Sequence, residues 1–393
     1  MDVRHGMQET DRLAKLDFER HNAEVKELWP AFDAGVAPRV PIAFGTNSRY
    51  FMGDPTANPE GLTFQPYIEN PDVMFDAQVK YQRWSRFNLL QDQELGCPEK
   101  WSVGVDFQNF YEAAWFGCKV KYFEGQVPDT RPDFAKNPES LLEKGIPGAF
   151  DGIMGQAIEY YEHLKERGAR EGYLGRPVEA GCFTGSGTDG PVTVACNLFG
   201  PVFVFSTLLE DPDRMHRLFE FITEATIQRM EAWRERFGIP VPQDGFGMAD
   251  DSIALISTSM YRDEILPYHR RIYDTFGTQK GRGIHLCGDS TRHFVLLRDE
   301  LNIRSFDTGF PVDFGDLRRK LGPDIRIQGG PHVELLISAT PVQVREEVRR
   351  ILTSGILQGG RFQLREGNNL APKTPLANTE AMYRAGVEFG KLG

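Results

Sequence analysis

A histidine and a cysteine two residues apart, His285 and Cys287, form the sharpest chemical feature of this 393-residue sequence. They lie in the run RGIHLC (282–287), whose apolar and polar residues alternate in the manner of a β-strand. Alternate side chains share one face of a strand, so the imidazole and the thiol can converge on one ion. Both are good zinc ligands, and a catalytic zinc site typically keeps three protein ligands and one open position. The alternative is that both are buried side chains that happen to alternate.

Polar residues that follow other expected strands are candidates for a third ligand. Glu366 comes directly after the strand expected at 361–365, and we take it as the candidate. Strict alternation would place it on the same face as Phe362, although alternation often fails at the last residue of a strand. Other residues in comparable positions keep the choice open: Asn368, His332, Cys182, Asp250 and Asp251.

The paired carboxylates Asp250 and Asp251 follow the strand expected at 241–247. Two carboxylates beside a strand end can act as acid and base, or can orient the ligands of a metal. We expect Asp251 and Glu366 to orient ligands or to move protons. The alternative for Asp251 is a helix N-cap, because Asp251-Ser252 precedes an apolar run.

Four arginines are candidates for contact with an anionic substrate: Arg361, Arg365, Arg326 and Arg49. We expect Arg365 or Arg361 to hold an anionic part of the substrate, with Arg365 in the catalytic set, and Arg49 to bind substrate as well. Guanidinium groups suit this task because their planar fork matches a carboxylate. The alternative is that these arginines, Arg326 included, form internal ion pairs with Glu179, Asp307 or Asp106.

The segment DFQN (106–109) offers carboxylate and amide groups beside aromatic residues. We expect Asp106 and Asn109 to form a polar, substrate-binding wall of a pocket, with a helix cap as the alternative. His332, which follows another expected strand, is a further substrate-binding candidate. The Gly-rich run 184–190 lacks a P-loop lysine and the dinucleotide-binding spacing, so we interpret it as a mobile lid or a turn.

These residues can lie close together only in a fold in which several strands end at the same place. The order of expected strands and helices along the chain predicts such a fold. From residue 177 onward, strands mostly alternate with helices, which favours βαβ units and a parallel sheet. The strands predict a closed (β/α)8 TIM barrel, whose active site lies where strands end. The expected helices are 9–33, 73–92, 151–168, 211–237, 261–276, 341–354 and 375–391. The eight expected strands are 39–44, 101–106, 177–182, 241–247, 282–287, 302–307, 324–328 and 361–365.

Side-chain alternation in the C-terminal half agrees with a barrel. In the strands expected at 282–287, 324–328 and 361–365, apolar residues share one face and polar residues the other. Polar groups inside a barrel are costly unless they serve a site or pair with one another. Residues 34–75 are rich in Pro, Gly and Asn and are expected to be mostly irregular. We therefore divide the chain into an N-terminal helical and irregular extension (1–75) and a barrel catalytic domain (76–393).

Composition narrows the class of protein. The chain has 45 Lys and Arg against 56 Asp and Glu, a net charge of −11, so nucleic acid is not an expected partner. Five cysteines predict no disulfide framework and fit a reducing compartment. The N-terminal residues lack the apolar core of a signal peptide, and the most apolar stretch, 197–209, is too short for a membrane span. We expect a cytoplasmic protein with no membrane partner.

Several segments resemble the uroporphyrinogen decarboxylase superfamily, most closely its cobalamin-dependent, methylcobamide:coenzyme M type methyltransferase branch. The resemblance is good from about residue 200 to the end and thin before it. It implies a (β/α)8 barrel with a deep mouth. The segments that carry it are DDSIALISTSMYRDEILPYHRRIYDTFG (250–277), GIHLCGDS (283–290), ATPVQVREEVRRIL (339–352) and residues 359–386, with a weaker echo at 115–130.

In that branch, a His-x-Cys on one strand and a later Cys bind zinc, which holds the thiol of an acceptor as a thiolate that takes a methyl group from methylcobalamin. His285 and Cys287 match the first two ligands. The later Cys falls near Asn368, where this chain has Glu366-Gly367-Asn368-Asn369, so the resemblance supplies no third Cys. The decarboxylase branch matches less well, because its Arg-rich motif has at best Arg49 as a counterpart.

These observations lead to one expected function and two alternatives. We expect a component that moves a methyl group between a small methylated substrate or carrier and cobalamin, with zinc at His285 and Cys287 as a Lewis acid. The expected partners are a small methylated substrate and a separate corrinoid protein that carries the cobalamin, and a homodimer stays open. The first alternative is a metal-independent decarboxylase of a tetrapyrrole or another polycarboxylate. The second is a non-catalytic tetrapyrrole-binding protein.

Overall fold

The computed structural model describes residues 2–393, which form two compact units built from interleaved chain segments. The first unit contains residues 2–103, His163–Gly181 and Asp307–Gly393. The second unit contains Gly104–Glu162 and Cys182–Phe306. The predicted division at residue 75 is a different one and stays a prediction.

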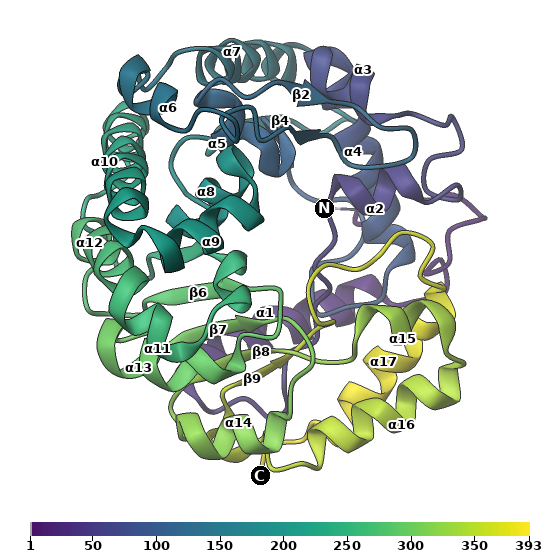
Figure 1. Cartoon of the computed structure of the whole chain (residues 1–393). Helices are drawn as coiled ribbons and strands as arrows, with labels where there is room; N and C mark the ends of the chain where they lie inside the picture. The colour runs from purple at the N-terminus through teal and green to yellow at the C-terminus, as the bar shows by residue number, and fades with distance from the viewer. Residues whose placement is uncertain (1) are drawn as a thin grey trace. The chain divides into compact units, whose positions relative to one another are not determined.

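The first unit pairs parallel strands with helices at both ends of the chain. Its α16 and α17 pack against each other (Figure 1). Its helices are α1 (Phe18–Ala34), α2 (Ser48–Gly53), α3 (Phe64–Glu69), α4 (Pro71–Asn88), α14 (Phe314–Leu321), α15 (Val333–Ser338), α16 (Pro341–Leu352) and α17 (Leu376–Phe389). Its strands are β1 (Trp101–Gly104), whose last residue enters the second unit, β4 (Val178–Gly181), β8 (Arg326–Gly329) and β9 (Phe362–Leu364).

The second unit is built around a long helix, α10 (Pro212–Phe237), which packs against α8, α9 and α12 (Figure 1). Its other helices are α5 (Tyr111–Trp115), α6 (Glu139–Lys144), α8 (Pro191–Phe199), α9 (Pro201–Glu210), α11 (Thr258–Met260), α12 (Leu266–Phe276) and α13 (Phe294–Leu301). Its strands are β2 (Val120–Lys121), β3 (Asp129–Thr130), β5 (Gly247–Ala249) and β6 (Gly283–Leu286). Two elements, α7 (Ile153–Glu171) and β7 (Ser305–Thr308), pass from one unit into the other.

Parallel pairing dominates the strands that follow α10. In the second unit, β5 pairs with β6 in parallel, with Ala249 opposite His285. In the first unit, β8 pairs with β9 in parallel, with Gln328 opposite Gln363. The short strands β2 and β3 are antiparallel. The expectation of an α/β fold with parallel strands alternating with helices is therefore confirmed for this half of the chain.

Helix ends follow their capping residues. The helix expected at 9–33 begins only at Phe18, because the Asp17 side chain accepts the N–H of Arg20 and caps it there. Thr340 and Gln343 form a reciprocal capping box at the start of α16. The other expected helices are confirmed with small shifts at their ends. Among the helices that were not expected are α8 and α9, whose sequence is apolar on most sides.

Two expected strands are wrong in detail. The segment 34–75 is mostly irregular, as expected, although it also contains α2, α3 and the start of α4. The strand expected at 39–44 forms only isolated bridges, one of them between Ile42 and Leu364, because Pro41 lacks a backbone donor. The strand expected at 241–247 is replaced by β5, which starts at Gly247, because prolines at 240 and 242 interrupt the ladder.

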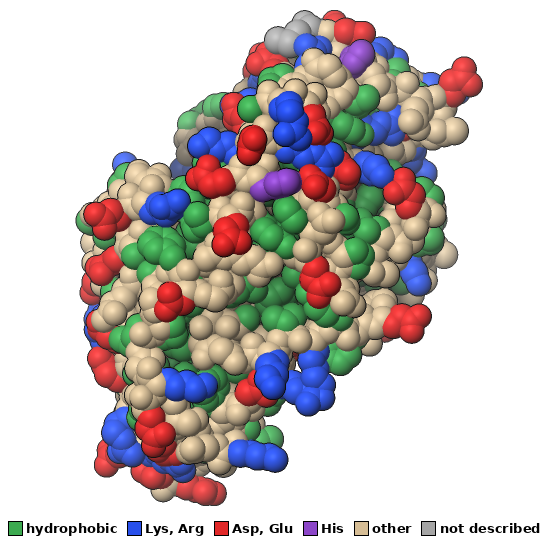
Figure 2. All heavy atoms as spheres, turned by 90° about the horizontal axis from the view of Figure 1, so that it is seen from above, with side chains coloured by type: hydrophobic (Ala, Val, Ile, Leu, Met, Phe, Trp, Pro, Cys, Tyr) green, Lys and Arg blue, Asp and Glu red, His purple; other side chains and the backbone are tan. Residues whose placement is uncertain are grey.

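The surface carries both signs of charge. Figure 2 shows one face on which acidic and basic side chains are interspersed among apolar ones. Within residues 2–393, no single helix is both long and apolar enough to cross a membrane, and α8 with α9 meet that criterion only as a pair bent by 110°.

Candidate metal site

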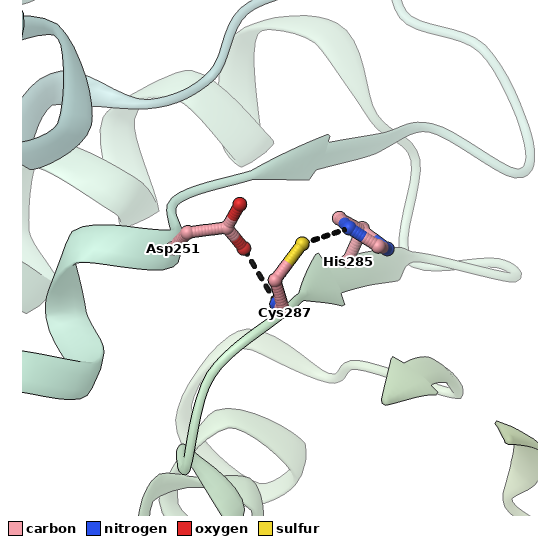
Figure 3. A group of neighbouring side chains, drawn as sticks. All are labelled: Asp251, His285 and Cys287. Atoms are coloured by element: carbon pink, nitrogen blue, oxygen red, sulfur yellow. Dashed lines mark hydrogen bonds between the residues drawn. The ribbon is translucent and has the colours of Figure 1, made fainter. Parts of the chain in front are cut away.

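His285 and Cys287 converge at the carboxyl end of β6. Ile284 and Leu286 are buried on one face of this strand, and His285 points to the other. The Nε2 atom of His285 lies 2.8 Å from the Sγ atom of Cys287 (Figure 3). The prediction that alternation brings this imidazole and this thiol together is confirmed.

Asp251 brings a carboxylate to the same place from the neighbouring strand. It follows β5 and begins the short 3-10 helix η2 (Asp251–Leu255). Its Oδ1 atom accepts the backbone N–H of Cys287 at 2.6 Å (Figure 3). One ligand atom each from Asp251, His285 and Cys287 lie within 4.8 Å of one another. Because β5 and β6 are parallel neighbours, their ends place residues 36 apart in sequence side by side.

The donor set suits zinc. It offers one imidazole nitrogen, one sulfur and one carboxylate oxygen, which are the three ligand types that zinc takes in proteins. Burial raises the pKa of the Cys287 thiol, while the hydrogen bond from His285 opposes that rise. A cation at this point would favour the thiolate in the same way, since a coordinating thiol loses its proton.

Asp250 does not cap the short helix that follows it. The helix η2 has no side-chain cap bond, so the interpretation of Asp251-Ser252 as an N-cap is wrong. The carboxylate of Asp250 instead accepts the backbone N–H groups of Val192 and Thr193, at the start of α8. Asp250 is fully buried and also accepts from His269 at 2.8 Å. The two adjacent aspartates therefore have separate tasks.

Asp189 is a residue that sequence reasoning missed. It lies in the Gly-rich run 184–190, interpreted as a lid or a turn. Burial, with the nearby charges of Glu112 and Asp251, raises the pKa of its carboxyl to about 7. Its position in the loop that follows β4 was the available signal, because barrel sites collect residues from such loops.

A buried ion pair fixes the backbone that carries Asp189. Glu112 and Arg229 are both fully buried and lie 2.7 Å apart. Glu112 accepts the N–H of Asp189 at 2.6 Å, and Arg229 donates to the carbonyl of Gly187 at 2.6 Å. The Arg229 guanidinium also lies 5.1 Å from the ring of Trp115. The pair ties this run of the loop to α5 and α10.

In the first unit, Glu366 and Arg365 form a second polar cluster. Glu366 is fully buried, and its Oε1 atom accepts the N–H of Gly45 at 2.8 Å. Burial raises the pKa of its carboxyl to about 7. Arg365 pairs with Asp307 at 2.9 Å and donates to the carbonyl of Asn368 at 2.6 Å, so the internal ion pair weighed as an alternative is present. Glu366 is not one of the three clustered donors, and its role as a metal ligand stays a prediction.

Some polar atoms of this cluster have no protein partner. Among the described residues, the Oε2 atom of Glu366 and the Nε atom of Arg365 are buried and make no hydrogen bond. Buried polar atoms are normally paired, so such exceptions call for an explanation. The two atoms are an acceptor and a donor that a polar ligand would satisfy.

The remaining predicted substrate-binding residues include two that form hydrogen bonds to backbone groups of the protein. Arg361 donates to the carbonyl groups of Phe32 and Asp33 at the other end of β9 from Glu366. The Nδ1 atom of His332 accepts the N–H of Glu334 and caps α15.

Three other candidates lie near helix starts. Asp106 accepts from Gln108, directly ahead of the 3-10 helix η1 (Gln108–Phe110) that contains Asn109. Arg49 lies in the first turn of α2. The substrate-binding roles of all five residues stay predictions.

An α/β chain of this size, in which polar side chains collect at the ends of parallel strands, has the plan of a barrel enzyme. The chain belongs to the uroporphyrinogen decarboxylase (URO-D) family, whose sequence profile matches residues 31–389. The resemblance inferred from residues 250–290 and 339–386 is thereby confirmed, and with it the fold class.

The chain is also similar to two methyltransferases. Over 288 residues it is 28% identical to a methylated-thiol–coenzyme M methyltransferase of Methanosarcina mazei, covering 70% of this chain and 69% of that protein. A solved structure of a methyltransferase from Methanosarcina mazei superposes with a TM-score of 0.62 at 18% identity, covering 93% of this chain and 98% of the other. At that identity the second comparison supports the fold.

Proposed function

We propose that this protein is a methyltransferase that moves a methyl group between a small methylated compound and the cobalamin of a separate corrinoid protein. The observation that carries the proposal is the cluster of Asp251, His285 and Cys287 at the ends of β5 and β6. Support also comes from the similarity to a methyltransferase whose name specifies methylated thiols and coenzyme M.

Zinc fits the residues of this cluster. His285, Cys287 and Asp251 would hold it, and a zinc with three protein ligands would keep a position open for a substrate atom. When bound, zinc supplies a Lewis acid that stabilises negative charge on the sulfur or oxygen that loses or gains the methyl group. Asp251 would supply the third ligand in place of the family's later Cys, which has no counterpart near Asn368 in this chain. A carboxylate is a harder ligand than a thiolate, which favours zinc over soft ions such as Cu(I).

The roles of the protein groups follow from their contacts. Cys287 orients Asp251 through its backbone N–H, so the carboxylate faces the thiol and the imidazole. In the first unit, Glu366 has one oxygen fixed by Gly45 and the other without a protein partner. With a pKa near 7, this carboxyl can hold or release a proton at neutral pH. The buried Nε–H group of Arg365 has no protein acceptor and would donate a hydrogen bond to an anionic or polar part of the substrate.

The test measures metal content and methyl transfer in the same preparations. Untagged wild-type protein is expected to contain about one zinc per chain, and Cys287→Ala is expected to contain none. Cys97→Ala, which removes a buried cysteine outside the cluster, is the control and should keep its zinc. The wild type and this control should exchange methyl groups with cobalamin in the presence of one member of a panel of methyl thiols, methyl ethers and methylamines.

Two results would contradict the proposal. The first is protein that binds no zinc and transfers no methyl group across the panel. The second is release of CO₂ from uroporphyrinogen by protein stripped of metal, which would support the decarboxylase instead.

A further inference from the structure

We infer that Thr193 is a positioning residue that fixes Asp251 for metal binding, an inference that rests on the proposed function. Thr193 lies in the first turn of α8 and is not one of the three clustered donors. It acts on the two chain neighbours of Asp251. Sequence patterns gave no sign of this role, because α8 was not expected as a helix.

The hydroxyl of Thr193 bridges the residues on both sides of Asp251. It donates to Oδ1 of Asp250 at 2.7 Å and accepts the backbone N–H of Ser252 at 3.0 Å. The backbone N–H of Thr193 donates to the same Asp250 oxygen at 2.8 Å. Because both flanking residues are held by one side chain, the backbone direction of Asp251 is set from two sides.

Both carboxylate oxygens of Asp250 already accept two hydrogen bonds each from the protein. Asp250 therefore stabilises the backbone next to Asp251, and Asp251 is the residue that can bind a metal. The second oxygen of Asp250 accepts the N–H of Val192 at 3.1 Å and that of the His269 ring at 2.8 Å. His269 is itself buried and hydrogen-bonds to the hydroxyl of Tyr261 at 2.9 Å. The start of α8 adds a favourable field, since free N–H groups at a helix N-terminus stabilise an anion.

The start of α8 also packs closely against Ala249 and Asp250. We call these contacts, together with the hydrogen bonds of Thr193, the clamp. Gly190, just before α8, has a φ of 81°, and a Cβ atom there would lie 2.6 Å from Asp250 and from the carbonyl of Ala249. The absence of a side chain lets the helix start approach the turn. The clamp therefore fixes Asp251 before any ion binds, and such outer contacts typically change metal affinity 10- to 100-fold.

The test compares three valine and serine variants of full-length protein. Thr193→Val keeps the shape of the side chain and removes both hydroxyl bonds, whereas Thr193→Ser keeps the hydroxyl. Thr223→Val is the matched control, because Thr223 is fully buried in α10 of the same unit and its hydroxyl has no hydrogen-bond partner. Zinc affinity is measured by competition with a chromophoric chelator, and the absorption spectrum of bound Co²⁺ reports the ligand geometry.

Thr193→Val is expected to weaken zinc binding by about 10-fold or more and to alter the Co²⁺ spectrum. Thr193→Ser and Thr223→Val should stay within about threefold of the wild type. Wild-type affinity and spectrum in folded Thr193→Val would overturn the inference. If Thr193→Val does not fold, Asp250→Asn provides the second variant, because its amide nitrogen cannot accept from Val192 and His269. Unchanged affinity in that variant also contradicts the clamp. Absence of zinc binding in the wild type would instead contradict the proposed function.

Discussion

The backbone N–H of Cys287 donates a 2.6 Å hydrogen bond to Oδ1 of Asp251, although 36 residues separate the two in the sequence. This bond joins the ends of β5 and β6, so the pairing of the two strands also positions the three clustered donors. A substitution of Asp251 can therefore change the affinity for a metal, the stability of the connection between β5 and β6, or both. Different variants can separate these effects.

Asp251→Asn should weaken zinc binding by about 10- to 100-fold while leaving the fold intact. The asparagine side chain still offers an oxygen to the N–H of Cys287, but it lacks the charge that suits a divalent cation. Zinc affinity by chelator competition and thermal melting measure the two effects separately. Asp289→Asn, at an exposed position just past β6, is the control and should match the wild type. Equal affinities in the two variants would remove Asp251 from the ligand set.

Glu366→Gln should change how stability depends on pH. In the folded protein, burial raises the pKa of Glu366 from 4.5 to about 7. The folded state therefore holds a proton between these values that the unfolded chain has lost, and stability falls as pH rises from about 4.5 to 7. The loss of unfolding free energy from this difference in pKa is at most about 3.4 kcal/mol.

The glutamine variant, which keeps the acceptor for Gly45 but cannot ionise, should lose less stability than the wild type over that range. Urea unfolding at pH 5 and pH 8 measures the difference. Parallel stability curves for the two proteins would show that Glu366 does not titrate in this window.

Breaking the buried pair of Glu112 and Arg229 should be severe. Both side chains are fully buried, so Arg229→Met would leave an unpaired carboxylate and cost about 3 to 5 kcal/mol of unfolding free energy. Replacing both residues, as Glu112→Leu with Arg229→Met, should recover much of the loss because no lone charge remains. Denaturant unfolding gives both values. Arg20→Ala, which breaks an exposed pair with Glu24, should not shift the unfolding midpoint measurably. A double variant as unstable as Arg229→Met would mean that the pair acts through its specific hydrogen bonds to the loop.

Sequence patterns predicted the parts of this site that lie on one element. The convergence of His285 and Cys287 follows from the period of a strand, which is a local property. The contribution of Asp251 depends on the pairing of β5 with β6, and single-sequence periodicity does not specify which strand ends become neighbours. Asp250 illustrates the limit most clearly: the neighbouring Asp251-Ser252 suggested a local cap, yet Asp250 binds the first turn of α8, 57 residues away from it. Long helices with polar and apolar faces were predicted well, whereas α8 and α9, which are short and apolar on most sides, were not expected.

Gly190→Ala should disturb the metal site from a position that offers no ligand. The φ of 81° is strained for any residue with a side chain, and a Cβ atom would meet Asp250 and the carbonyl of Ala249 at 2.6 Å. Strain and crowding together should cost at least about 2 kcal/mol of unfolding free energy. Because the crowding pushes Asp250 away from α8, zinc affinity should fall as well. Gly187→Ala, three residues earlier in the same loop, is the matched control, since nothing lies within 4 Å of where its methyl group would be and its φ lies outside the left-handed region. A Gly190→Ala protein that loses stability but keeps wild-type zinc affinity would show that the start of α8 supports the fold without positioning Asp251.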